Sequence, residues 1–216
     1  VRMSDTEKLD LERVNNRIAS TSNEDLQKVL EKLLPSLIPL SNNSNLQPQV
    51  LTIISNITRR MKSLQTSISC SQLLFKLVTP EMMPYACNIA ISVIDISIDY
   101  IPLSDRELCA TAIIDCLDKF GNEYSYQTNS LLSYTLKLLP EIASVLKNNE
   151  ISHRVRGLIS SWFLDVSLIQ PGLKKDGVGS IQPGLSKERV ARLTAKIDNW
   201  GYSMLNEMKT RILESI

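Results

Sequence analysis

The chain has 216 residues, of which 43% are hydrophobic and 22% are charged, and its formal net charge is +1. This composition is typical of a protein that folds around a hydrophobic core, and it excludes a disordered tail. The sequence has no dense stripe of Lys and Arg with interleaved aromatic residues, which argues against nucleic-acid binding.

The first 40 residues predict two amphipathic helices joined by a short polar turn. Apolar residues recur with the helical period on the first, at Leu11, Val14 and Ile18. Ser22 followed by Asp25 marks the start of the second, because a serine hydroxyl can accept from a free backbone N–H there. Its apolar stripe is Leu26, Val29, Leu30, Leu33 and Leu34. Pro35 and Pro39 are expected to bend or end this helix.

A third helix is predicted after the polar turn at residues 42–45. Its apolar stripe is Val50, Ile53, Ile54, Ile57 and Met61. Arg59, Arg60 and Lys62 lie in its last turn, where cations complement the helix dipole. The dipole role is the favoured interpretation, and the same three cations are candidates for contact with a protein partner.

Further helices are predicted along the rest of the chain, at residues 71–78, 85–100, 104–120, 125–146 and 152–169. The alternation of Ile89, Ile91 and Val93 would also suit a β-strand. A helix is preferred there, because a lone strand would leave buried backbone groups without hydrogen-bond partners.

A long loop is predicted at residues 171–185, which contain four of the seven glycines. The sequence Ile-Gln-Pro-Gly-Leu brackets it, at residues 169–173 and again at 181–185. Lys174 and Lys175 lie in this loop and are further candidates for partner binding. The predicted organisation is therefore helical repeats over residues 1–170, the Gly/Pro-rich loop, and an amphipathic helix over 186–216.

The residues that usually carry metal or nucleophilic chemistry are sparse. The four cysteines form no CxxC pair and His153 is the one histidine, so a zinc site of the usual spacing is not predicted. His153 lies beside Arg154 and Arg156, which disfavours a catalytic imidazolium. No phosphate, dinucleotide or zinc-protease motif occurs. We therefore predict no catalytic residue, no metal and no cofactor.

Two other groups have both a functional and a structural interpretation. Asp95 and Asp99 are four residues apart and could form an acid–base pair, but a solvated helix face is favoured. Trp162 and Phe163 could anchor a partner, but core packing is favoured because they lie on a helical apolar period. The two aspartates also interrupt the most apolar stretch, so no membrane span is predicted. Buried free thiols fit a reducing cytoplasm or nucleus.

The pairing of short helices favours an all-α, HEAT-like α-solenoid of antiparallel helix pairs. Residues 33–57 show the pattern of one HEAT repeat: a first helix with a proline bend, a short turn and a second helix. Gln47 stands where such a repeat usually has an arginine. Because an apolar stripe still runs at residues 215–216 and no methionine stands at position 1, we expect further repeats in a longer protein.

Four segments resemble the extreme N-terminus of a known family. They are Leu11-Glu12-Arg13-Val14, Arg17-Ile18-Ala19, Leu30-Glu31-Lys32-Leu33-Leu34-Pro35, and residues 50–63 ending Ile57-Thr58-Arg59-Arg60-Met61-Lys62-Ser63. In order and spacing they are similar to the proteasome adapter and scaffold proteins, the large Ecm-type HEAT-repeat family. A thinner similarity continues through residues 101–103, 163–166 and 183–186.

The resemblance implies a scaffold without catalytic activity that binds the proteasome and links or stabilises its core and regulatory particles. It also implies a place in the cytoplasm and nucleus. The alternative is a generic HEAT or armadillo adaptor in intracellular transport or complex assembly, which the helix pairs alone would equally support.

Overall fold

A computed structural model of the chain describes residues 5–64, 69, 71–120, 126–148, 151–170, 180–181, 187–188, 190–191, 193–194 and 210. Over these residues the fold is all-α, as predicted, apart from one pair of two-residue strands. The chain divides into two compact units, Val1–Leu131 and Leu132–Ile216. The predicted loop at 171–185 falls mostly outside the described residues, so the predicted domain organisation stays a prediction.

The first unit begins with three long helices, α1 (Asp5–Ser20), α2 (Asn23–Leu40) and α3 (Gln47–Leu64). It continues with the short helix α4 (Ser71–Leu74), the 3-10 turn η1 (Phe75–Leu77) and α5 (Pro84–Ser97). Two further 3-10 turns, η2 (Ile98–Tyr100) and η3 (Leu103–Asp105), lead into α6 (Arg106–Phe120). Helix α7 (Tyr126–Lys137) crosses from the first unit into the second.

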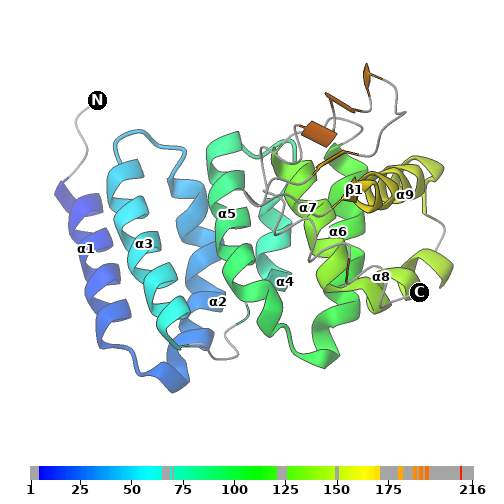
Figure 1. Cartoon of the computed structure of the whole chain (residues 1–216). Helices are drawn as coiled ribbons and strands as arrows, with labels where there is room; N and C mark the ends of the chain where they lie inside the picture. Colours follow the sequence, from blue (N-terminus) through cyan, green and yellow to red (C-terminus); the bar gives the residue numbers. More distant parts are fainter. Residues whose placement is uncertain are drawn as a thin grey trace. The chain divides into compact units, whose positions relative to one another are not determined.

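Each helix of the first unit packs against helices that lie one to three places from it along the chain. Helix α3 contacts α1 and α2, α5 contacts α2, α3 and α4, and α6 contacts α4. In Figure 1, α1, α3, α2 and α5 lie side by side with their axes roughly aligned. This neighbour-to-neighbour packing is what stacked helix pairs require, because each pair buries its apolar face against the next.

Helix α2 starts as the sequence predicts but does not end at its first proline. The Ser22 hydroxyl accepts from the backbone N–H of Asp25 at 3.2 Å and caps the helix. Both Pro35 and Pro39 lie inside the helix, which runs to Leu40. Each proline removes one backbone hydrogen bond. The helix continues because its apolar face is buried in the core, through Leu26, Leu30, Leu34, Leu37 and Ile38.

The ambiguous β-branched stretch is helical, as predicted, and forms α5 and η2. Residues Ile89, Ile91 and Val93 are all buried. Because α5 contacts three other helices, it needs apolar residues on several faces, and its sequence therefore lacks a clean one-sided stripe.

Several helix boundaries differ from the sequence prediction. The helix predicted at 152–169 ends at Ser167, and Ile169 belongs to a short strand. Ser104 lies inside η3 and donates to the Asp105 carboxylate at 2.9 Å, so the following helix begins at Arg106 instead of Ser104. The single helix predicted at residues 125–146 is two helices, α7 and α8 (Leu139–Asn148), which break at Leu138. Pro140 has no N–H to continue the α7 ladder, but it suits the first turn of a new helix.

In the second unit, α8 is followed by α9 (His153–Ser167), which Ser152 caps by accepting from the Val155 N–H at 3.3 Å. The strands β1 (Ile169–Gln170) and β2 (Ser180–Ile181) pair antiparallel, with Ile169 opposite Ile181. Residues 187–188, 190–191, 193–194 and 210 are helical, and Leu193 is buried. The rest of the helix predicted at 186–216 lies outside the described residues.

Candidate functional site

Arg60 joins the third helix to the end of the first. Its guanidinium donates to the Ile18 carbonyl at 2.7 Å and to the Thr21 carbonyl at 2.5 Å. It also donates to the Asn23 side-chain oxygen at 2.7 Å. The last carbonyls of a helix have no partner within the helix and carry partial negative charge. Arg60 therefore caps α1 and fixes the turn that leads into α2.

A second contact, one turn before Arg60 on α3, supports the same arrangement. The Asn56 amide nitrogen donates to the Asn15 side-chain oxygen at 3.1 Å, across the α1–α3 interface. The Asn56 oxygen in turn accepts from Arg59 at 3.3 Å. Because α1 is held on α3 at these points, the space between α1 and α2 has fixed walls.

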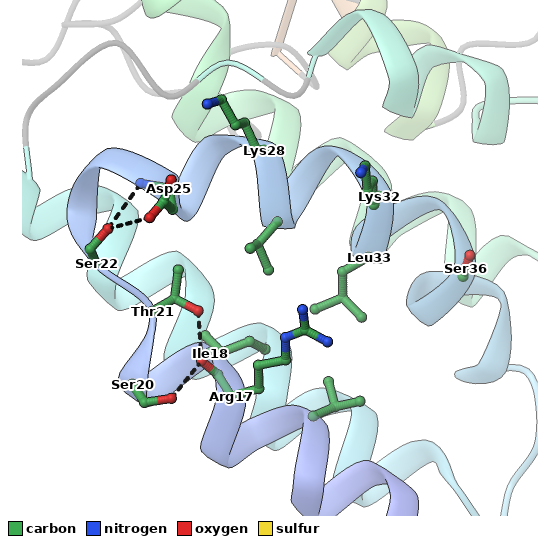
Figure 2. Close-up of a pocket in the computed structure, with 12 residues that line it drawn as sticks. Arg17, Ile18, Ser20, Thr21, Ser22, Asp25, Lys28, Lys32, Leu33 and Ser36 are labelled. Carbon is green, nitrogen blue, oxygen red and sulfur yellow. Dashed lines mark hydrogen bonds between the residues drawn. The ribbon is translucent and has the colours of Figure 1, made fainter.

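That space is an open groove of about 890 Å³, the α1–α2 groove. Its lining is Val14, Arg17, Ile18 and Ser20 from α1, Thr21 and Ser22 from the turn, and Asp25, Lys28, Val29, Lys32, Leu33 and Ser36 from α2. Figure 2 shows Arg17 reaching from α1 into the space between the helices, with Lys28 and Lys32 standing along α2.

The groove combines an apolar floor with a basic rim. Val14, Val29 and Leu33 are half-buried, so part of each side chain faces the open space. Arg17, Lys28 and Lys32 are exposed, and none of them forms an ion pair with any residue the structure describes. The one acidic lining residue, Asp25, accepts a hydrogen bond from the Ser22 hydroxyl at 2.9 Å.

The structure separates the roles of the basic residues named as partner-binding candidates. Arg59 and Lys62 are exposed on α3, whereas Arg60 is partly buried and committed to the end of α1. Lys174 and Lys175 lie outside the described residues. Partner binding by Arg59, Lys62, Lys174 and Lys175 stays a prediction. For Arg60, the dipole interpretation holds in modified form, because the helix end it caps belongs to α1 and not to α3.

Sequence reasoning did not identify the α1–α2 groove. The apolar period places Val14, Val29 and Leu33 on the stripes predicted to face the core. These stripes include more residues than the core buries, because all three side chains are half-buried. The signal that could have found it is this excess width, since the buried face of α2 is formed by Leu26, Leu30, Leu34, Leu37 and Ile38, without Val29 or Leu33. Val29 and Leu33 lie beside that face, four residues apart.

The residues considered for acid–base chemistry all lie at exposed positions. Asp95 on α5 and Asp99 in η2 are both exposed, which agrees with the solvated-face interpretation. His153 is the exposed first residue of α9. Among the described residues no cluster of three or more His, Cys, Asp or Glu side chains could hold a metal ion. Of the described helices, none combines the length and the apolar character that a membrane span needs.

Trp162 and the thiols that the structure describes belong to the core, as the sequence favours, whereas Phe163 is half-buried. Trp162 is fully buried, and its ring centroid lies 5.8 Å from that of Phe163. Burial raises the pKa of Cys87 to about 11, and that of Cys109 and Cys116 to about 12. Such thiols stay protonated near neutral pH and are poor nucleophiles. Cys70 lies outside the described residues.

Comparison with known proteins gives one family. A family model described as "Proteasome component ECM29, N-terminal" matches residues 11–216. No curated protein and no solved structure matches the chain significantly. The matched range contains all the elements described above except the first turns of α1.

Proposed function

The chain belongs to the family of the N-terminal region of the proteasome component ECM29, and from this membership we propose that it is part of a non-catalytic scaffold that binds the proteasome. In this proposal the full-length protein links or stabilises the core and regulatory particles, and this chain supplies its N-terminal helices. The observation that carries the proposal is the match over residues 11–216, which agrees with the resemblance of residues 11–63 found in the sequence.

The proposal includes a HEAT repeat formed by α2 and α3. A first helix with internal prolines, a short Asn-rich turn and a second helix follow one another in the order that this repeat requires. The turn is held locally, since the Asn43 side chain accepts from the Asn45 N–H at 3.0 Å. Stacked repeats of this kind bind partners over extended faces, which suits attachment to a large assembly.

A binding role without catalysis is supported by where the reactive side chains lie. Asp95, Asp99 and His153 are exposed on separate elements, and the described thiols are buried with raised pKa values. We also propose a location in the cytoplasm and nucleus, with which buried free cysteines are compatible because those compartments are reducing.

The linking role is tested with the full-length protein and purified proteasome particles. Core and regulatory particles are mixed at a concentration where they associate only partly. Native gels then separate core particles that carry one regulatory particle, two or none. The proposal expects a saturable increase in assembled particles when the full-length protein is added. An unchanged distribution, with the protein bound to neither particle, would remove the scaffold function.

A further inference from the structure

We propose that the α1–α2 groove binds a short acidic peptide segment, carrying apolar side chains, from a protein partner. This inference rests on the proposed scaffold function and names the chemistry of one contact that such a scaffold makes. It depends on the floor of the groove, its rim charges and its length.

The floor of the groove consists of two apolar pairs on facing helices. Val14 and Ile18 are four residues apart on α1, and Val29 and Leu33 are four residues apart on α2, so each pair lies on one face of its helix. Ile18 is almost fully buried, while Val14, Val29 and Leu33 are only half covered. Covering the three exposed surfaces with apolar side chains of a ligand would be favourable by the hydrophobic effect.

The rim of the groove selects for negative charge. Three exposed cations, Arg17, Lys28 and Lys32, line it. Asp25 is the one acidic residue in the lining of the groove. It lies in the first turn of α2, where the positive end of the helix dipole and the Ser22 hydroxyl interact with its carboxylate. The lining therefore has a net charge of +2, from three basic residues and one acidic residue.

The other acidic residues of α2 do not offset this charge within the groove. Glu24 and Glu31 are absent from its lining, and the Glu31 carboxylate accepts from the Gln27 amide at 2.9 Å. Negatively charged ligand groups on the rim would thus meet cations that have no ion pair with a described residue. Electrostatic complementarity of this kind selects partners and speeds association.

The length of the groove suits an extended segment more than a compact small molecule. Its lining on the second side runs from Ser22 to Ser36, which is about 21 Å at 1.5 Å per residue. An extended peptide advances roughly 3.3 Å per residue, so about six residues fill that length. In an extended segment, successive side chains alternate between two sides. Apolar side chains can therefore meet the floor while acidic ones reach the rim.

Two other occupants are less well matched. The last 60 residues of this chain carry eight basic and six acidic side chains, and this net positive charge matches the basic rim poorly. A second copy of the chain could offer the acidic residues of its middle part, residues 76–119. Self-association is therefore one outcome that the test must separate from peptide binding.

The test uses the 216-residue chain and a fluorescently labelled hexapeptide with alternating Leu and Glu. Binding is followed by fluorescence anisotropy, and the site is mapped by methyl NMR of Val14, Ile18, Val29 and Leu33. We expect saturable binding with shifts at these methyl groups. A matched peptide with Lys in place of Glu should not bind, and binding of the acidic peptide should weaken as salt screens the rim charges.

Charge-reversal variants give the decisive comparison. Lys28→Glu combined with Lys32→Glu should weaken peptide binding about tenfold or more, because attraction at two rim positions becomes repulsion. The control combines Lys76→Glu with Lys147→Glu, exposed positions outside the groove, and changes the net charge equally. It should leave binding within about twofold. A Leu33→Gln variant tests the floor and should also weaken binding, with far-UV circular dichroism confirming that it folds.

Three results would overturn the inference. They are no peptide binding by the folded chain, an equal loss in the groove and control charge variants, or NMR shifts confined to other regions. A doubled mass in light scattering that the Lys28/Lys32 variant abolishes would assign the groove to self-association instead. None of these results touches the proposed scaffold function, which falls only if the full-length protein fails to bind proteasome particles.

Discussion

Replacing Arg60 by alanine should loosen the first helix, because one guanidinium holds the end of α1 against α3. The variant removes two charge-assisted bonds to partly buried carbonyls, of Ile18 and Thr21, and one bond to the exposed Asn23 side chain. A hydrogen bond to a charged group contributes about 1.5–3 kcal/mol. Because water reaches the freed carbonyls, each of these two bonds should contribute near the lower end of that energy range, and the bond to the exposed Asn23 side chain should add little. We expect a loss of about 2–3 kcal/mol in the free energy of opening α1.

Amide hydrogen exchange measures this loss directly, because it reports local opening separately for each helix. The α1 amides of Arg60→Ala should exchange roughly 30- to 150-fold faster than those of the unaltered chain. Arg60→Lys keeps the charge but loses the planar fork, and should lie in between.

The neighbouring residue supplies a matched control. Arg59 is exposed and, within the part of the chain that the structure describes, donates to the Asn56 side-chain oxygen at 3.3 Å, so Arg59→Ala should change the free energy of opening α1 by less than about 0.5 kcal/mol. If α1 exchanges equally fast in both alanine variants, then Arg60 does not hold the helix and the assigned role is wrong.

Two further predictions concern the thiols and the cap of α2. In a Cys70→Ser background, Cys87, Cys109 and Cys116 should resist a thiol reagent at pH 8 until the chain is unfolded, since burial raises their pKa values to about 11–12. Because these folded pKa values exceed the unfolded value of 9.0, the free energy of unfolding should be unaffected by these thiols below pH 9 and should fall as pH rises above it, which urea titrations measure. Rapid labelling of the thiols in the folded chain would contradict their burial. Ser22→Ala should cost about 1 kcal/mol by removing the cap at the Asp25 N–H, measured by exchange of the α2 amides. Ser36→Ala, at an exposed position of the same helix, should change little, and an equal loss in both would show that Ser22 is no cap.

Much of the helical organisation can be predicted from hydrophobic period and caps. Ser22 and Ser152 both cap the helices that follow them, and the stripe of α3 is buried as expected. On α2 the predicted stripe is buried at Leu26, Leu30 and Leu34, whereas Val29 and Leu33 are half-buried. The family of the chain can also be predicted from short segments, because segments within residues 11–63 resemble the family whose model matches residues 11–216. These features are visible in sequence since each depends on residues within a few turns of one another.

The features that sequence reasoning missed depend on contacts between distant residues. Arg60 was assigned to the dipole of its own helix, yet its partners are 37 to 42 positions away. Pro35 and Pro39 inside α2 are tolerated because core burial outweighs the two lost hydrogen bonds, while Pro140 coincides with a break. Neither outcome follows from the prolines alone.

The strand pair gives a physical meaning to one part of the repeated Ile-Gln-Pro-Gly-Leu sequence. Ile169 of the first copy pairs with Ile181 of the second, so the two isoleucines are neighbours across the antiparallel pair. β-branched residues suit such cross-strand positions. A repeat of this spacing in a glycine-rich stretch is therefore a hairpin signal that periodicity searches for helices do not detect.

Binding of the full-length protein to purified proteasomes tests the central claim most directly. The two are mixed, separated by sedimentation through a density gradient, and quantified in each fraction. The proposed scaffold function predicts that the protein moves into the proteasome fractions and saturates at a fixed ratio. If it stays in the light fractions at all concentrations, with its helices intact by circular dichroism, the scaffold function is contradicted.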